Sequence, residues 1–290
     1  MESQKSSSTK KWLIGCGIGC GAVIIIGIIL IVGGVFFIKN MVTSFEESED
    51  ILRELTEKYG EIEEYCPSPS GSIAPDRMEA FLKTRELIQP EIKELEQTFD
   101  LLSDEQEQKR AEKKESSGVF KKIKTGIGLI PKIAEFLKKR NQALLEVKMG
   151  IGEYYYIYTI AYYSWLDKSI TDGVPIHINR ENEFDYHYGE DEESQEIRRD
   201  LAVRRLNKML LPMLKNQYER LKKTADREIS ENWRSDLKEE IEAMEKDRYR
   251  LVWQDGLPEV IESSLKPYKD RLESSYSSSL NNLELLLEQR

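Results

Sequence analysis

The chain has 290 residues, of which 43 are basic and 53 are acidic. Four basic residues and one acidic residue lie in the first 40 positions, which leaves 39 basic and 52 acidic residues, a net charge of −13, in the rest. That balance disfavours nucleic acid as a partner. Two of the three cysteines lie in one apolar stretch, which excludes a disulfide-stapled scaffold.

That stretch, residues 12–38, contains no charged side chain. About 20 apolar residues in a helix cross the hydrocarbon core of a bilayer, so the segment is long enough to span it with some tilt. A secretory signal has a shorter apolar region, of about 7–15 residues, followed by a small-residue cleavage site. Neither feature is present, so the sequence predicts an uncleaved transmembrane anchor.

Charges beside the apolar segment predict its orientation. Lys5, Lys10 and Lys11 precede it, whereas Lys39 alone follows it closely and the acidic residues 46–50 come next. Because basic residues favour the cytoplasmic side, residues 1–11 are predicted to be cytoplasmic and the C-terminal domain extracytoplasmic. The result would be a single-pass integral membrane protein.

The first turns of the apolar segment are rich in small residues. Small residues at these positions are interpreted as ordinary helix packing. Because glycines four positions apart let two helices approach closely in lipid, self-association into a homo-oligomer is the alternative. Acylation or redox chemistry at the two cysteines beside them is the third interpretation, and no metal ligands lie nearby. The glycines concerned are Gly15, Gly17, Gly19 and Gly21.

After the anchor, apolar residues recur every three or four positions, which is typical of helices that bury one face. A membrane-proximal helix is predicted over residues 39–65, followed by a turn-rich loop over 66–76 that holds three prolines and a glycine. A first helical sub-bundle follows over 77–171. Its first helix is expected to be kinked or broken at Pro90, and a short helix is expected to restart at Ser103.

An acidic loop over residues 172–193 separates this part from a second helical sub-bundle over 194–290. The last helix of that sub-bundle is predicted to run without interruption from Leu265 to Leu287. The predicted fold class is therefore all-α, with one transmembrane helix followed by an antiparallel bundle of long helices.

Residues 152–169 are unusually aromatic, with seven aromatic side chains in twelve positions. A helix that is apolar nearly all round is usually the central helix of a bundle. The alternative interpretation is a ligand or peptide groove. The stripe that would line it comprises Tyr155, Tyr158, Tyr162 and Trp165.

Residues 118–140 combine an apolar face with seven basic residues and one acid. This composition is typical of a helix that lies in the membrane interface and binds anionic head groups. The alternative is that the apolar face joins the bundle while the basic side chains pair with acidic neighbours. The basic residues are Lys121, Lys122, Lys124, Lys132, Lys138, Lys139 and Arg140.

Both histidines lie in a segment whose alternating pattern predicts a small β-hairpin over residues 174–188. A turn at Asn182 would place His177 opposite His187, with Asp185 on the same face. These three side chains could bind Zn²⁺ or Cu²⁺. The alternative is a surface hairpin without a metal.

No nucleophile elbow, phosphate-binding loop, zinc-protease motif or dinucleotide fingerprint occurs in the sequence. Catalysis is therefore not expected, nor is a cofactor. The leading hypothesis is a membrane-anchored helical scaffold or interaction protein whose partners are the lipid bilayer and another protein. A small-ligand or lipid-binding domain with a tyrosine-lined cavity is the alternative, and a membrane-tethered enzyme comes third.

Overall fold

The computed structural model describes residues 47, 50–112, 118–173, 177–178, 184–185, 192–223 and 231–286. Residues 48–290 form one compact unit, distinct from residues 1–47. The predicted anchor and its glycines lie outside the described residues. Within the described part of the chain, no helix is both long enough and apolar enough to cross a membrane.

The described residues are almost entirely helical, which confirms the predicted all-α class. Residues 50–59 form the first described helix. The later helices are η1 (Ile62–Glu64), α2 (Pro75–Leu87), α3 (Gln89–Glu112), α4 (Gly118–Glu146), α5 (Ile151–Tyr158), η2 (Thr159–Trp165), α6 (Glu192–Lys223), α7 (Glu231–Lys246), α8 (Glu259–Leu265), η3 (Lys266–Tyr268), α9 (Lys269–Ser275) and α10 (Asn281–Leu286).

Of the two predicted outcomes near Pro90, a kink or a break, the structure has the break: α2 ends at Leu87 and α3 begins at Gln89. Pro90 is the second residue of α3, where a missing backbone N–H leaves no hydrogen bond unmade. The prediction of a separate helix from Ser103 is wrong, because α3 continues through this residue to Glu112. No glycine or proline occurs between Glu91 and Glu112 that would end it.

The prediction of one continuous last helix is also wrong. Pro267 lies in the short 3₁₀ helix η3, and Tyr276 is extended, with ψ of 136°. Three serines follow Tyr276, and the Ser277 hydroxyl accepts a hydrogen bond from the backbone N–H of Leu280. Serines compete for backbone hydrogen bonds in this way and so favour helix ends. The helical pattern is interrupted there and resumes as α10.

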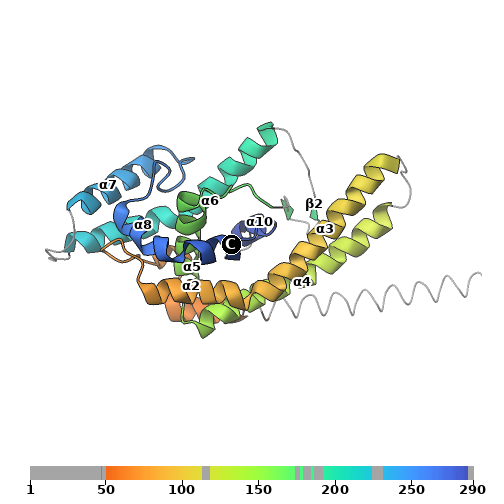
Figure 1. Cartoon of the computed structure of the whole chain (residues 1–290), viewed down its shortest axis with the longest axis horizontal. Helices are drawn as coiled ribbons and strands as arrows, with labels where there is room; N and C mark the ends of the chain where they lie inside the picture. The colour runs from red at the N-terminus through yellow and green to blue at the C-terminus, as the bar shows by residue number, and fades with distance from the viewer. Residues whose placement is uncertain are drawn as a thin grey trace, which may run out of the picture. The chain divides into compact units, whose positions relative to one another are not determined.

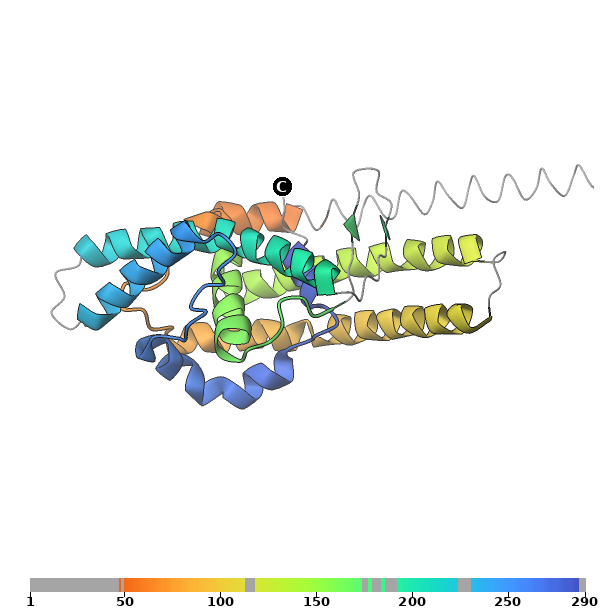
Figure 2. The same ribbon diagram turned by 90° about the horizontal axis from the view of Figure 1, so that it is seen from above.

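Two hydrophobic clusters hold the described helices together. The larger surrounds α5 and η2, which lie between α2 and α6 (Figure 1, Figure 2). The smaller joins α3, α4 and α10, and the two views show α3 and α4 side by side. Each cluster takes residues from both predicted sub-bundles, so residues 172–193 do not separate two cores.

A two-residue antiparallel ladder, β1 (His177–Ile178) with β2 (Phe184–Asp185), lies within the predicted hairpin. Its register differs from the predicted one, because His177 pairs with Asp185 rather than with His187. A shift of two residues leaves every side chain on its original face, so the alternating pattern fits both registers equally well.

Candidate functional site

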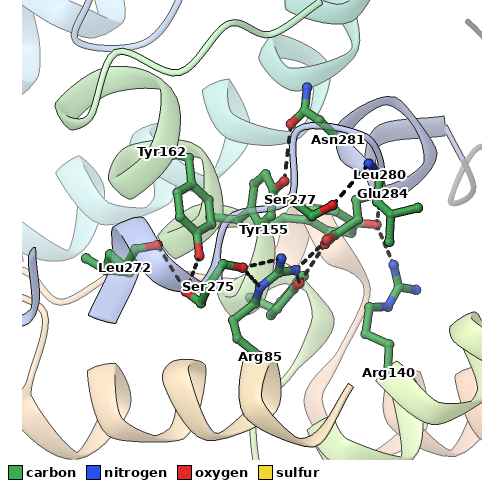
Figure 3. A network of polar contacts seen from close by, with 12 residues as sticks. Arg85, Arg140, Tyr155, Tyr162, Leu272, Ser275, Ser277, Leu280, Asn281 and Glu284 are labelled. Carbon is green, nitrogen blue, oxygen red and sulfur yellow. Dashed lines mark hydrogen bonds and ion pairs between the residues drawn. The ribbon is translucent and has the colours of Figure 1, made fainter. Parts of the chain in front are cut away.

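A buried polar network joins the tyrosine-rich helix to the end of the chain (Figure 3). Two groups of residues meet in it. We call the first the cradle, and it consists of Arg85, Arg140, Tyr154, Tyr155, Tyr158 and Tyr163. The second, here called the C-terminal segment (residues 276–286), contributes Asn281 and Glu284.

The centre of the network is an ion pair between Arg85 of α2 and Glu284 of α10. Both side chains are buried, with 0% and 1% of their surfaces exposed, and Nη1 of Arg85 donates to Oε1 of Glu284. Tyr154 completes a triangle: its hydroxyl accepts from Arg85 at 2.9 Å and donates to Oε2 of Glu284 at 2.7 Å. Both carboxylate oxygens of Glu284 therefore receive a hydrogen bond, which a buried charge requires.

Arg85 has further contacts that fix its orientation. Its Nε and Nη2 atoms donate to the carbonyl oxygen of Ser275 at 3.2 and 2.8 Å. Its guanidinium carbon lies 5.5 Å from the ring centroid of Tyr158 and 5.9 Å from that of Tyr162. Arginine over an aromatic face is a favourable cation–π arrangement. The side chain is thus held on three sides.

A second buried arginine supports the same segment indirectly. Arg140 of α4 donates to the hydroxyl of Tyr155 at 3.1 Å, and that hydroxyl donates to the carbonyl oxygen of Glu284 at 2.9 Å. Oδ1 of Asn141 accepts two further hydrogen bonds from Arg140. This relay satisfies a backbone acceptor in a six-residue helix that has few hydrogen bonds of its own.

Asn281 is the second polar anchor of the C-terminal segment. Its Oδ1 accepts from the hydroxyls of Tyr158 at 3.2 Å and of Tyr163 at 2.5 Å. Its Nδ2 donates toward the carbonyl oxygens of Ser169, Ile170 and Asp172, at 3.2–3.3 Å. The fully buried amide is therefore engaged on both ends.

A local departure from α-helical geometry allows two tyrosines to reach Asn281. The segment η2 is a π-helix, in which hydrogen bonds join residues five positions apart. Tyr158 and Tyr163 are five positions apart, so the wider turn brings them closer to one face than an α-helix would. Such π-helical turns occur often at functional sites.

Burial dominates the electrostatics of the cradle. It raises the pKa of Tyr154, Tyr158 and Tyr163 well above the usual tyrosine range, because an ionised phenol would lose its hydration. Burial is the largest single effect on Arg85 and acts to lower its pKa, but the Glu284 carboxylate and the surrounding tyrosines together outweigh it, so the pKa of Arg85 is raised. The tyrosines are therefore neutral donors and Arg85 carries a positive charge.

The four residues of the predicted tyrosine stripe differ in burial. Tyr155, Tyr158 and Tyr162 are buried at 0–2% exposure, as the interpretation of a central helix requires. Their hydroxyls bond to Glu284, Asn281 and Ser275 within the chain. Trp165 is half-buried at the edge of the larger cluster. The chain's own C-terminal part therefore occupies the position at which the alternative interpretation placed a ligand or peptide.

A small pocket does lie beside another tyrosine of the same helix. It has a volume of about 120 Å³ and is lined by Tyr65, Arg77, Glu153, Tyr156 and residues of the loop between Pro67 and Ala74. Arg77 binds Glu153 through two hydrogen bonds, of 2.7 and 2.6 Å. The Tyr156 hydroxyl is buried and has no hydrogen-bond partner among the described residues. Tyr156 thus combines a position in the lining of the cavity with a hydroxyl that lacks a partner in the described part of the chain.

The basic segment 118–140 forms most of α4, and the prediction that Arg140 contacts the membrane surface is wrong. Arg140 has 0% of its surface exposed, because it points into the cradle. Lys132 pairs with Glu94, and Lys138 and Lys139 pair with Glu135. Of Lys121, Lys122 and Lys124, only the backbone is described.

The apolar face of the same helix packs into the smaller cluster through Leu129, Ile133 and Phe136. For the described side chains of α4, the interpretation in which this face joins the bundle is therefore confirmed.

The predicted metal site is only partly described. The ladder brings His177 opposite Asp185, while His187 lies outside the described residues. Within the described ranges, no group of three or more histidine, cysteine, aspartate or glutamate side chains is placed to hold a metal ion. The three-residue site therefore stays a prediction.

The sequence contains a signal for the network that lies outside the predicted tyrosine stripe. Arg85, Arg140 and Glu284 each follow a buried apolar residue by four positions, namely Phe81, Phe136 and Leu280. Residues four apart share a helix face, so each charge lies on the buried side of its helix.

Comparison with known protein families, with curated proteins and with solved structures finds no match for this chain.

Proposed function

We propose that the protein is a single-pass, membrane-anchored helical interaction protein that works by binding rather than by catalysis. The observation that carries the proposal is the uncharged segment 12–38, which is longer than a bilayer crossing requires. Its basic N-terminal flank supports a cytoplasmic N-terminus and an extracytoplasmic body. Gly15, Gly17, Gly19 and Gly21 would bring two anchors together.

The acidic, helical body supports a role in contacts with proteins. An anchored domain searches only the membrane surface, which raises its effective concentration for a partner held there. Two of the large apolar side chains most exposed in the described part, Ile197 and Leu201, lie four residues apart on α6. Such a pair is a suitable contact for a partner helix. The lipid bilayer is the second partner, and Lys121, Lys122 and Lys124 of α4 are the residues to test at its surface.

Carbonate extraction of membranes tests the anchor. The intact chain should stay with the membranes, whereas a chain with Ile25→Lys and Ile28→Lys should be released, because charges at the centre of a span are costly. Val42→Lys, outside the segment, is the matched control. Release of the unmodified chain, or a mature N-terminus beyond residue 38, would contradict the proposal.

Two further measurements test placement and role. In sealed vesicles that expose their cytoplasmic face, the body should be protected from added protease, and its digestion would reverse the proposed orientation. Crosslinking in native membranes should recover a second protein with the chain. Replacing Ile197 and Leu201 by Ser should reduce that recovery, with Leu101→Ser on α3 as the exposed apolar control.

The pocket beside Tyr156 supports a second candidate, the binding of a small polar molecule. Its volume of about 120 Å³ suits a compound of a few heavy atoms, and Tyr156, which lines it, has a hydroxyl without a hydrogen-bond partner among the described residues. Glycerol and acetamide are suitable probes in thermal denaturation. A rise in Tm that disappears in Tyr156→Phe would support the idea, and an equal rise in both chains would contradict it.

A further inference from the structure

The charge of Arg85 is neutralised in the described structure by the C-terminal segment. The cation–π contacts with Tyr158 and Tyr162 and the hydrogen bonds to Ser275 orient the guanidinium but bring no negative charge. In the described ion pairs, its carboxylate partner is Glu284. A buried guanidinium without an anion is strongly unfavourable. The cradle therefore demands an acidic side chain at this position.

The cradle is built from helices that pack on one another without α10. Arg85 lies on α2, Arg140 on α4, and the tyrosines on α5 and η2. α2 contacts both α4 and α5, and α5 continues into η2. The rings of Tyr154 and Tyr158 pack on each other at a centroid separation of 6.0 Å. These contacts preorganise the site for an incoming segment.

The C-terminal segment behaves as a ligand of this site. It presents Asn281 and Glu284, three positions apart on α10, to the tyrosine hydroxyls and to Arg85 (Figure 3). Leu280 and Leu283 fill the smaller cluster beside them. The first residues of the segment, 276–280, are non-helical and connect α9 to α10. The segment thus presents the short helix α10, with a defined recognition pattern, at the end of a non-helical link.

We infer that the cradle is a receptor site for an acidic helical peptide with Asn and Glu three residues apart, and that its occupant in an assembled pair is the C-terminal segment of a second copy. This inference rests on the proposed role of the body as an interaction module. Exchange between identical chains repeats every contact seen within one chain, so it needs no new interface. Two copies held in one membrane meet at a high effective concentration.

Peptide binding to the full chain tests the receptor. The probe is a fluorescent peptide of residues 276–290, and the receptor is the chain with Asn281→Ala and Glu284→Gln, whose own segment competes weakly. This chain should bind the peptide at least tenfold more tightly than the unmodified chain does. The Glu284→Gln peptide should bind at least tenfold more weakly than the original, whereas Ser278→Ala, at an exposed position, should not change its affinity.

Equal affinities of the two peptides with Glu or Gln at 284 would overturn the inference, as would equal affinities of the two chains. If crosslinking still recovered another protein in membranes, the proposed function would stand while this inference failed. If the peptide affinities were equal and crosslinking recovered no second protein, both this inference and the proposed function would fail.

Charge reversal tests the exchange and does not require the single variants to fold alone. Arg85→Glu and Glu284→Arg, carried on separately tagged chains and co-expressed, restore both pairs only when the segments are exchanged. The two chains should then co-purify as a dimer, whereas each expressed alone should not dimerise. A chain carrying both changes is the control that restores the pair internally. Folding of that control without co-purification of the separate variants would overturn exchange between copies.

Discussion

Removing the negative charge of Glu284 is the sharpest perturbation of the buried network. Glu284→Gln keeps the size and shape of the side chain but leaves Arg85 charged and without a counter-ion at 0% exposure. It also changes the acceptor of the Tyr154 hydroxyl, which donates to Oε2 at 2.7 Å. The substitution therefore tests the charge itself rather than the packing of α10.

The expected cost follows from the burial of both partners. Breaking a buried ion pair by removing one charge costs about 3–5 kcal/mol, because the remaining ion keeps its desolvation penalty. The amide oxygen of Gln can still accept one hydrogen bond from Arg85, so we expect a loss near the lower end, about 3 kcal/mol. In a unit of this size, that loss corresponds to a fall in Tm of about 6–12 °C.

The assay is urea unfolding of the purified full chain, followed by far-ultraviolet circular dichroism. Glu79→Gln is the matched control, since Glu79 pairs with Arg271 between two helices but is 53% exposed. That pair should contribute about 0–1 kcal/mol. Adding Arg85→Met to Glu284→Gln should recover part of the loss. Equal effects of Glu284→Gln and Glu79→Gln would refute the argument that burial makes the central pair matter.

Three further results are expected. Because burial raises the pKa of Tyr154, Tyr156 and Tyr158 above the unfolded value of about 10, their contribution to stability is complete below pH 10 and is lost as pH rises further. Tyrosinate absorbance should accordingly appear together with loss of helical circular dichroism. Tyr154→Phe should destabilise by about 1–3 kcal/mol in urea unfolding, whereas Tyr156→Phe, which removes a hydroxyl that has no partner among the described residues, should be neutral or stabilising. Gly152→Ala should cost about 1–3 kcal/mol in the same assay, since its Cβ would lie 2.4 Å from the carbonyl oxygen of Ile62.

Helical periodicity predicted most of the described fold, because each helix buries one face and its apolar residues recur accordingly. The periodicity predicted the wrong helix ends where a proline or a run of serines interrupts a helix whose apolar residues keep helical spacing. The apolar residues from Leu265 to Leu283 keep helical spacing, yet Pro267 and the serines after Tyr276 interrupt the helix. Spacing alone reports which face is buried and does not report that the chain turns between two buried segments.

The candidate site was only half predictable. An aromatic helix at the centre of a bundle followed from its composition, but the partner of its hydroxyls did not. Buried tyrosine hydroxyls need hydrogen-bond acceptors, and here the acceptors are Asn281 and Glu284, which lie more than 110 positions from the tyrosines in the sequence. Sequence spacing carries no information on such distant pairs. The available signal was a charge on a buried face, which demands an opposite charge somewhere in the fold.

The residues of α10 explain why a polar network, and not hydrophobic contact alone, holds the C-terminal segment in place. Leu280 and Leu283 remove apolar surface from water, but hydrophobic contact is non-directional and would allow the segment to slide. A slip of four residues in one direction would place Leu280 against the guanidinium of Arg85, and a slip of four in the other would place Leu285, in place of Asn281, against the hydroxyls of Tyr158 and Tyr163. Each misplaced register thus carries a buried, unpaired polar group and the penalty that goes with it. The leucines supply the attraction, and the ion pair with its tyrosines selects one position, whether the segment belongs to the same chain or to another copy.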